Sequence, residues 1–133
     1  MAKVLIVDDS TVQRTILKKF LEKEQHEIIG EAKNGQDAVA LYKDLNPDIV
    51  LLDIVMPDAN GIAILDQIIN QDENANVIIC SSTALRNLII ESIQIGAKGF
   101  LVKPITSETL LKTINKIMHM SKIPQNLKNR FCS

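Results

Sequence analysis

The sequence has little cysteine, no excess of charge of either sign and no long apolar run. Its two cysteines, Cys80 and Cys132, lie in an apolar run and a polar tail, so the chain has neither a disulfide framework nor a metal-ligand spacing. We expect Cys80 to be a buried structural thiol. Fifteen basic against sixteen acidic residues give a formal net charge of −1, which disfavours direct nucleic-acid binding through bulk electrostatics.

The apolar runs are too short for a membrane span or a targeting signal. Stretches such as 49–52 and 77–80 have the length of strands, far below the roughly 20 residues that a membrane span requires. The amino-terminal apolar run stops at Asp8 and Asp9 and is too short for the core of a secretory signal. We therefore expect a cytoplasmic protein without membrane insertion.

What the chain does contain is enough apolar material for one domain. It has 133 residues, of which 46% are hydrophobic and 23% are charged, as in a globular domain with one sizeable core. The helical periodicity ends after Met120. We therefore assign residues 1–120 to the domain and residues 121–133 to a polar carboxyl-terminal tail or the start of a linker.

Short apolar runs alternate five times with helical patterns, which is typical of an α/β fold with a parallel sheet. The predicted strands are 3–7, 27–32, 48–52, 76–80 and 99–102, which are rich in Val, Ile and Leu as strands covered on both faces should be. The first helix opens at Ser10, and the others cover about 36–45, 61–69, 84–95 and 106 onward. The apolar face of the first helix consists of Val12, Ile16, Leu17, Phe20 and Leu21.

Polar side chains collect just past the carboxyl ends of the predicted strands. They are Asp8 and Asp9 after the first strand, Asp53 after the third, Ser81, Ser82 and Thr83 after the fourth, and Lys103 and Pro104 after the fifth. In an open parallel sheet, ligands bind outside these ends, where the winding direction reverses. We therefore expect three carboxylates, a hydroxyl and an ammonium to converge on one edge. Residues 32–35, after the second strand, are interpreted as turn chemistry only.

Three converging carboxylates need a cation or a shared proton, because two of them about 4 Å apart repel by roughly 4 kcal/mol at an effective dielectric of 20. Oxygen-only ligands favour Mg²⁺, with Mn²⁺ as the alternative. His26 and His119 are expected to be ordinary surface histidines far from the cluster. Beside a divalent ion, a carboxylate can attack a phosphoryl group, while an ammonium and a hydroxyl bind its oxygens. The residues alone therefore predict an Mg²⁺-dependent phosphoryl acceptor site.

Three segments carry a family resemblance: 4–10, then 47–53 followed by Met56-Pro57 and Gly61, and finally 96–104. In this order and spacing they resemble the receiver domains of two-component response regulators, over residues 3 to about 119. The resemblance implies a flavodoxin-like, doubly wound α/β fold with five parallel strands in the order 2-1-3-4-5 and five helices. It also implies an aspartate that takes phosphate from a partner histidine kinase.

The resemblance implies roles by position. Asp53 is the expected phosphoacceptor, and Lys103 is expected to contact the phosphoryl oxygens. Asp9, Asp53 and the backbone carbonyl of Val55 are the expected direct Mg²⁺ ligands, with Asp8 acting mainly through metal-bound water.

Further roles concern the response to phosphorylation. Ser81 corresponds to the switch hydroxyl of the family, with Ser82 next to it and a slip of one residue left open. Phe100 stands at the position of an aromatic switch residue, with an ordinary core aromatic as the alternative. Pro104 is expected to follow a cis peptide bond that aims Lys103. Phosphorylation would then bias a surface made by the fourth helix, the fifth strand and the fifth helix.

The implied function is a signalling switch rather than an enzyme, one that assists its own phosphoryl transfer and dephosphorylation. Residues 30–35, 79–81 and 96–98 look most like stand-alone chemotaxis regulators, which implies the flagellar motor switch as a target and a phosphatase as a further partner. A phosphorelay intermediate and a receiver fragment of a longer regulator stay open. A haloacid-dehalogenase-type phosphohydrolase is more remote, since Ser10 stands where its second acid is expected.

Overall fold

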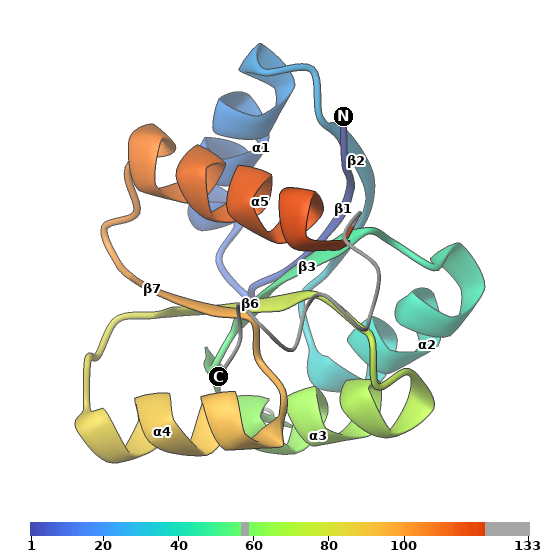
Figure 1. The fold of residues 1–133 in the computed structure, drawn as a ribbon, viewed down its shortest axis with the longest axis vertical. Coiled ribbons are helices and arrows are strands. Elements are labelled where there is room, and N and C mark those ends of the chain that lie inside the picture. Colours follow the sequence, from blue (N-terminus) through green and yellow to red (C-terminus); the bar gives the residue numbers. More distant parts are fainter. Residues whose placement is uncertain (57–58, 122–133) are drawn as a thin grey trace.

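The computed structural model describes residues 1–56 and 59–121, whose backbone forms a parallel sheet between two layers of helices (Figure 1). The sheet contains β1 (Lys3–Val7), β2 (Glu27–Ala32), β3 (Ile49–Asp53), β6 (Val77–Ser81) and β7 (Gly99–Val102). These strands lie in the order β2-β1-β3-β6-β7, and each neighbouring pair is parallel. Counted along the chain this is 2-1-3-4-5, so the predicted fold class is confirmed.

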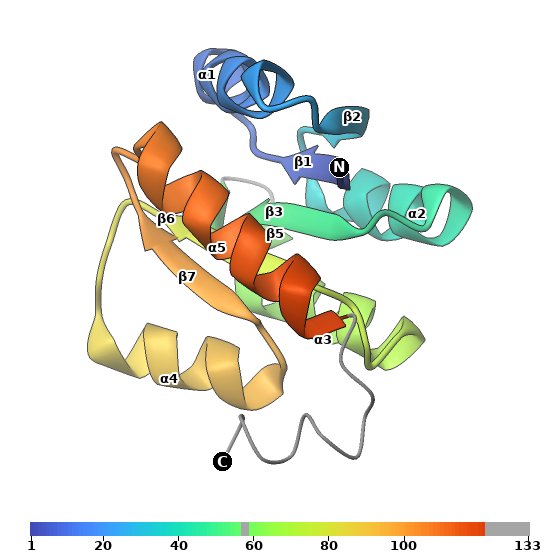
Figure 2. The ribbon, with the colours of Figure 1, turned by 45° about the horizontal axis from the view of Figure 1, so that its top comes forward.

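Five helices cover the two faces of the sheet. They are α1 (Thr11–Lys23), α2 (Gly35–Leu45), α3 (Gly61–Gln71), α4 (Arg86–Ile95) and α5 (Ser107–Ser121). Figures 1 and 2 show α1 and α5 on one face and the other three helices on the opposite face. The predicted cap at Ser10 is present, since its hydroxyl accepts the Gln13 N–H at 3.2 Å. The predicted end of α4 is confirmed at Gly96, where φ is +139°, a value that glycine adopts readily.

The core consists of two apolar clusters, one on each face of the sheet. Alternate strand residues enter alternate clusters, as the two-residue repeat of a strand requires. In β1, Leu5 and Val7 pack toward α2 and α3, while Val4 and Ile6 pack toward α1 and α5. Cys80 is 1% exposed in the second cluster, which confirms a buried thiol, whereas Cys132 lies outside the described residues.

Two strands end one residue later than predicted, and the extra residues are polar. Asp53 is the last residue of β3, where it pairs with Cys80, and Ser81 is the last residue of β6, where it pairs with Val102. The hydrogen-bond ladder therefore extends through both residues. An apolar pattern could not place this boundary, because the final position of each strand carries a polar side chain.

A short antiparallel pair, β4 (Val55–Met56) and β5 (Ala59–Asn60), was not predicted. It joins β3 to α3, and Pro57 of the resemblance motif lies outside the described residues. The fourth helix also begins two residues later than predicted, at Arg86. Its N-cap residue Leu85 has no side chain that can accept an amide hydrogen bond, so no capping signal marked the start.

The predicted apolar face of α1 is wrong at two positions. Leu17 and Leu21 are buried as expected, but Val12 is 70% exposed and Ile16 is 39% exposed. The buried stripe of α1 is narrower than the apolar pattern, because this helix packs mainly against β2 at the sheet edge and against α5.

The prediction for His26 is also wrong, because the side chain is half-buried and bonded. Its Nδ1 accepts the Ala2 N–H at 2.9 Å. Burial and the nearby amino terminus lower the pKa of this imidazole below its usual 6.5. His119 is exposed on α5, as expected.

The predicted division at residue 120 stays a prediction. The last described element, α5, ends at Ser121, and the assigned tail over 122–133 lies outside the described residues. Within residues 1–56 and 59–121, no helix has both the length and the apolar character that a membrane crossing needs.

Candidate functional site

Three carboxylates meet at the carboxyl edge of the sheet. Asp8 follows β1 directly, and Asp53 ends the neighbouring strand β3. One oxygen each of Asp8, Asp9 and Asp53 lies within 4.8 Å of the other two, with Asp8 and Asp53 buried and Asp9 exposed. The sheet topology alone produces this meeting, since adjacent parallel strands end at the same edge.

Lys103 brings a positive charge to two of these carboxylates. It follows β7, and its Nζ lies 2.9 Å from Asp8 Oδ2 and 3.5 Å from Asp53 Oδ2. Its backbone N–H donates to the Ser81 carbonyl at 2.7 Å, which ties the start of this loop to the end of β6. The peptide bond between Lys103 and Pro104 is cis.

Burial and charge pull the protonation of this cluster in opposite directions. Burial raises the pKa of Asp53, although the Val55 N–H and the Lys103 ammonium oppose the shift. For Lys103, burial acts to lower the pKa, but the hydrogen bond to Asp8 and the charges of Asp53 and Asp8 outweigh it and raise the pKa. The ammonium therefore stays charged over the whole neutral range.

The two oxygens of Asp53 have different environments. Oδ1 accepts the Val55 N–H at 3.1 Å, while Oδ2 faces Lys103. Asp8 is held more tightly, because Oδ1 accepts the Ser10 N–H at 2.9 Å and Oδ2 makes the shorter contact with Lys103. Of the two buried carboxylates, Asp53 thus makes the longer contact with the Lys103 ammonium.

The remaining predicted residues lie around this centre in different environments. Ser81 is fully buried at the end of β6, and its hydroxyl accepts the Thr83 N–H at 3.1 Å. Ser82 is exposed. Phe100 on β7 is half-buried and packs against the cluster on the α3 and α4 face. The Val55 side chain is 56% exposed beside the acidic cluster.

The donors of this edge fit a hard divalent cation. Three carboxylates against one ammonium leave negative charge in excess, and all of the donors in the acidic cluster are oxygen. Mg²⁺ prefers such ligands and commonly uses one or two carboxylates together with water and phosphate oxygen. The residues that could hold it are Asp8, Asp9 and Asp53.

Sequence reasoning missed Arg14 and Glu31. Arg14 Nη1 donates to the Asp8 carbonyl at 2.6 Å, and its Nε donates to Glu31 on β2 at 3.1 Å. Glu31 precedes residues 32–35, whose interpretation as turn chemistry agrees with the cap that Asn34 provides to the Asp37 N–H of α2. An arginine one turn into the helix that follows the acidic pair was the available signal.

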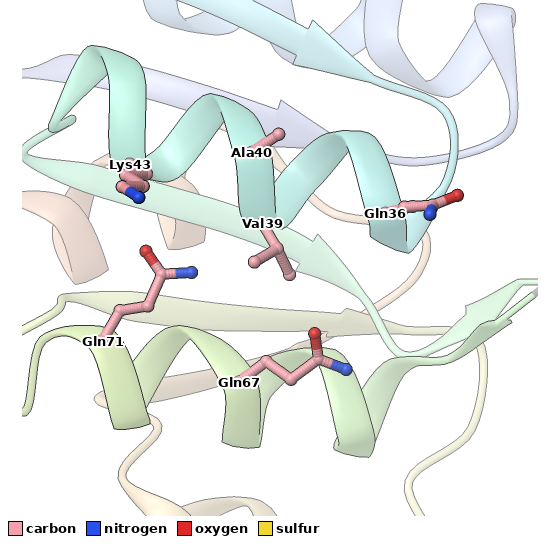
Figure 3. Close-up of a pocket in the computed structure, with 6 residues that line it drawn as sticks. All are labelled: Gln36, Val39, Ala40, Lys43, Gln67 and Gln71. Carbon is pink, nitrogen blue, oxygen red and sulfur yellow. The ribbon is translucent and has the colours of Figure 1, made fainter.

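A second concave region lies between α2 and α3 (Figure 3). This groove has a volume of about 690 Å³ and is lined by Gln36, Val39, Ala40, Lys43, Gln67 and Gln71. None of these lining residues is a carboxylate, and Lys43 is the one charged side chain among them. The groove therefore lacks carboxylates that could neutralise a divalent cation, and the carboxyl edge of the sheet is the better candidate.

Comparison with known proteins gives one consistent result. A family described as response regulator receiver domain matches residues 4–115. The chemotaxis protein CheY of Thermotoga maritima is 44% identical over 86% of this chain and 96% of its own length. CheY of Bacillus subtilis is 41% identical over 88% of this chain and 98% of its own length.

Solved structures agree with the sequence comparisons. A chain in the crystal structure of the CheX–CheY–BeF₃–Mg²⁺ complex from Borrelia burgdorferi superposes with a TM-score of 0.84 at 38% identity. The match covers 87% of this chain and 88% of that one. These similarities favour the receiver interpretation over the phosphohydrolase alternative.

Proposed function

Because the chain belongs to the response regulator receiver family, we propose that it is a signalling switch whose Asp53 accepts a phosphoryl group from a histidine kinase. The observation that carries this proposal is the position of Asp53, buried within the acidic cluster and 3.5 Å from the Lys103 ammonium. In the transfer, an Asp53 oxygen bonds to phosphorus while the bond from phosphorus to the histidine nitrogen breaks. The electron pair of that bond returns to the imidazole.

The other residues of the edge stabilise the charge on the phosphoryl group. Lys103 binds its oxygens, and the Ser81 hydroxyl is the neutral donor that turns toward them. Asp9, Asp53 and the Val55 carbonyl would hold Mg²⁺ directly, with Asp8 contributing through water. When bound, the ion neutralises the carboxylates and the incoming phosphoryl oxygens. The same chemistry assists loss of the phosphoryl group to water.

We further propose that the output surface consists of α4, β7 and α5. This surface already exposes apolar side chains, since Leu85, Ile90, Ile93 and Val102 are all more than 40% exposed. Phe100 lies on β7, within this surface and next to β6, which ends at Ser81, so its rotation would couple the surface to the phosphorylation site. The partner is a protein rather than nucleic acid, because the net charge is −1.

The pathway that fits best is chemotaxis in the cytoplasm, with the flagellar motor switch as target and a phosphatase that resets the signal. The names of the relatives from Thermotoga maritima and Bacillus subtilis support the pathway, and the CheX–CheY complex supports a phosphatase. Expression in a Bacillus subtilis strain that lacks its own CheY tests this assignment. Restored swarming supports it, and no swarming by a protein that is phosphorylated in those cells contradicts it.

The receiver chemistry itself is tested by intact-protein mass spectrometry after incubation with acetyl phosphate and Mg²⁺. We expect wild type to gain one phosphoryl group and Asp53→Asn to gain none. EDTA should abolish the gain in wild type. A wild-type protein that gains no mass with any divalent ion contradicts the proposal.

A further inference from the structure

Arg14 contacts the acidic loop through its backbone rather than through a carboxylate. Its Nη1 donates to the Asp8 carbonyl at 2.6 Å, and Nη2 donates to Thr11 Oγ1 at 3.3 Å. The Arg14 side chain is only 15% exposed. A guanidinium with several donors in fixed geometry can hold one acceptor in a defined direction.

Glu31 orients this guanidinium from the neighbouring strand. Its Oε1 accepts Arg14 Nε at 3.1 Å, and its Oε2 accepts Lys18 Nζ at 3.1 Å. The same strand holds Asp8 a second time, because the Asp8 N–H donates to the Ala32 carbonyl at 3.0 Å. Both backbone groups of Asp8 are therefore attached to β2, one directly and one through Arg14.

The contact to the Asp8 carbonyl also fixes the orientation of the peptide group between Asp8 and Asp9. The Asp8 carbonyl and the Asp9 N–H belong to one planar peptide group, so a bond to that oxygen fixes the plane from which Asp9 leaves. Asp9 needs this support, because its exposed carboxylate accepts no hydrogen bond from the described part of the chain and is repelled by Asp8 and Asp53. Without the anchor, repulsion would turn the Asp9 carboxylate outward.

We propose that Arg14, oriented by Glu31, is a positioning residue that holds the Asp8–Asp9 peptide so that Asp9 can share a divalent cation with Asp53. This inference rests on the proposed function, since it concerns the same cation site. Outer contacts of this kind orient the groups that bind a metal and strengthen its binding. The effect is opposite in sign to simple electrostatics, because removing a nearby positive charge would by itself strengthen cation binding.

The test is an NMR titration of ¹⁵N-labelled protein with MgCl₂, which yields the dissociation constant from the amide signals. We expect Arg14→Gln to weaken Mg²⁺ binding by about tenfold, within the range typical of outer-shell changes. Lys18→Gln is the matched control. It also removes a positive partner of Glu31 but keeps the contact of Arg14 to the Asp8 carbonyl. It should bind Mg²⁺ as tightly as wild type or slightly more tightly.

The metal-free spectrum supplies a second readout. The Asp9 amide signal should move in Arg14→Gln and stay in place in Lys18→Gln. Equal or tighter Mg²⁺ binding by Arg14→Gln would overturn the inference while leaving the proposed function intact. A wild type that does not bind Mg²⁺ would instead contradict the proposed function.

A variant that fails to fold does not end the test. Arg14→Lys keeps the charge, but one ammonium cannot reproduce the forked contacts to Asp8 and Glu31. We expect it to weaken Mg²⁺ binding as well. Unchanged affinity in Arg14→Lys would show that the forked contacts to Asp8 and Glu31 are not needed and would overturn the positioning role.

Discussion

Single residues at the carboxyl edge differ in how strongly the protein holds them. Asp8 is bonded through its N–H, its carbonyl and both carboxylate oxygens, whereas Asp53 keeps one oxygen toward Lys103 at 3.5 Å. Asp9 is exposed, and among the described residues its support comes through the backbone of Asp8. The three carboxylates of this cluster therefore differ in how firmly they are held, with Asp8 the most and Asp9 the least restrained.

Val55 sets an expectation for the lifetime of the phosphorylated state. Its side chain is exposed beside Asp53 but is apolar, so it cannot orient a water molecule for attack. We expect Val55→Asn to speed loss of the phosphoryl group by about tenfold. This gain is smaller than the rate gain usual for general acid–base groups, because an amide orients water but does not take its proton. Phosphate release after removal of acetyl phosphate measures the rate. Val55→Leu is the apolar control and should lose the phosphoryl group as slowly as wild type. An unchanged rate in Val55→Asn would contradict this prediction.

The acidic cluster should also affect the metal-free protein. Asp9→Asn removes one of three mutually repelling carboxylates, so we expect it to raise the melting temperature in EDTA. We expect Mg²⁺ at a tenfold excess over its dissociation constant to stabilise the wild type by about 1.4 kcal/mol, and this gain should shrink in the variant. Thermal unfolding with and without MgCl₂ measures both effects. Asp66 is an exposed carboxylate on α3, and Asp66→Asn should show neither effect. An Asp9→Asn protein with an unchanged melting temperature in EDTA and an unchanged response to MgCl₂ would contradict this account.

At the scale of secondary-structure elements, the first residue of α3, Gly61, packs closely against the backbone of Ile54. A Cβ added to Gly61 would lie within 2.7 Å of the Cα, C and O atoms of Ile54, none of which can move aside alone. We expect Gly61→Ala to destabilise the protein by roughly 1–3 kcal/mol, as overpacking usually does. Urea unfolding measures the change. Gly99→Ala, where a Cβ would meet the Thr113 methyl at 3.0 Å, should cost less, and the reverse order would contradict the packing argument.

His26 links the start of β2 to the start of β1, and this link should depend on pH. Its pKa is lowered in the folded protein, so its contribution to stability is complete above pH 6.5 and is lost as pH falls through the lowered pKa. Urea midpoints from pH 7 to pH 5 should therefore fall less in His26→Asn than in wild type. His119→Asn, on the exposed side of α5, is the control. Parallel pH profiles for wild type and His26→Asn would refute the assignment.

The sequence predicted the elements better than their exposed and polar details. Short runs rich in Val, Ile and Leu located all five strands of the main sheet, and the central strands β3 and β6 are buried along their whole length. Periodicity gave α1 a broad apolar face but did not show which part of it is covered, since Val12 and Leu17 lie about 140° apart around the helix and only Leu17 is buried. The pair β4 and β5 carried no pattern long enough to be recognised.

Prediction of the site had a similar limit. Asp8, Asp53 and Lys103 were identified because each follows an apolar strand, and parallel topology then brings them together. Arg14 and Glu31 were missed because their relation depends on the angle between α1 and β2. Half-burial of His26 depends likewise on the path of the α1–β2 connection.

At the scale of the whole molecule, the proposed reaction site and the proposed output surface occupy different parts of the doubly wound sheet. The carboxylates follow β1 and end β3, whereas α4 and β7, which carry the exposed apolar side chains, lie at the other side of the sheet from β2. Ser81 ends β6 and Phe100 lies in the adjacent strand β7, so the connection between the two regions is short. We therefore expect a charge placed on Asp53 to change this surface without rearranging the fold.

The central claim is that Asp53, among three adjacent carboxylates, carries the phosphoryl group. Borohydride reduction of the protein phosphorylated with acetyl phosphate converts an aspartyl phosphate to homoserine, which tandem mass spectrometry locates in the sequence. The account predicts homoserine in place of Asp53 and unmodified aspartate at Asp8 and Asp9. Homoserine at either of those two positions, with Asp53 unchanged, would contradict it.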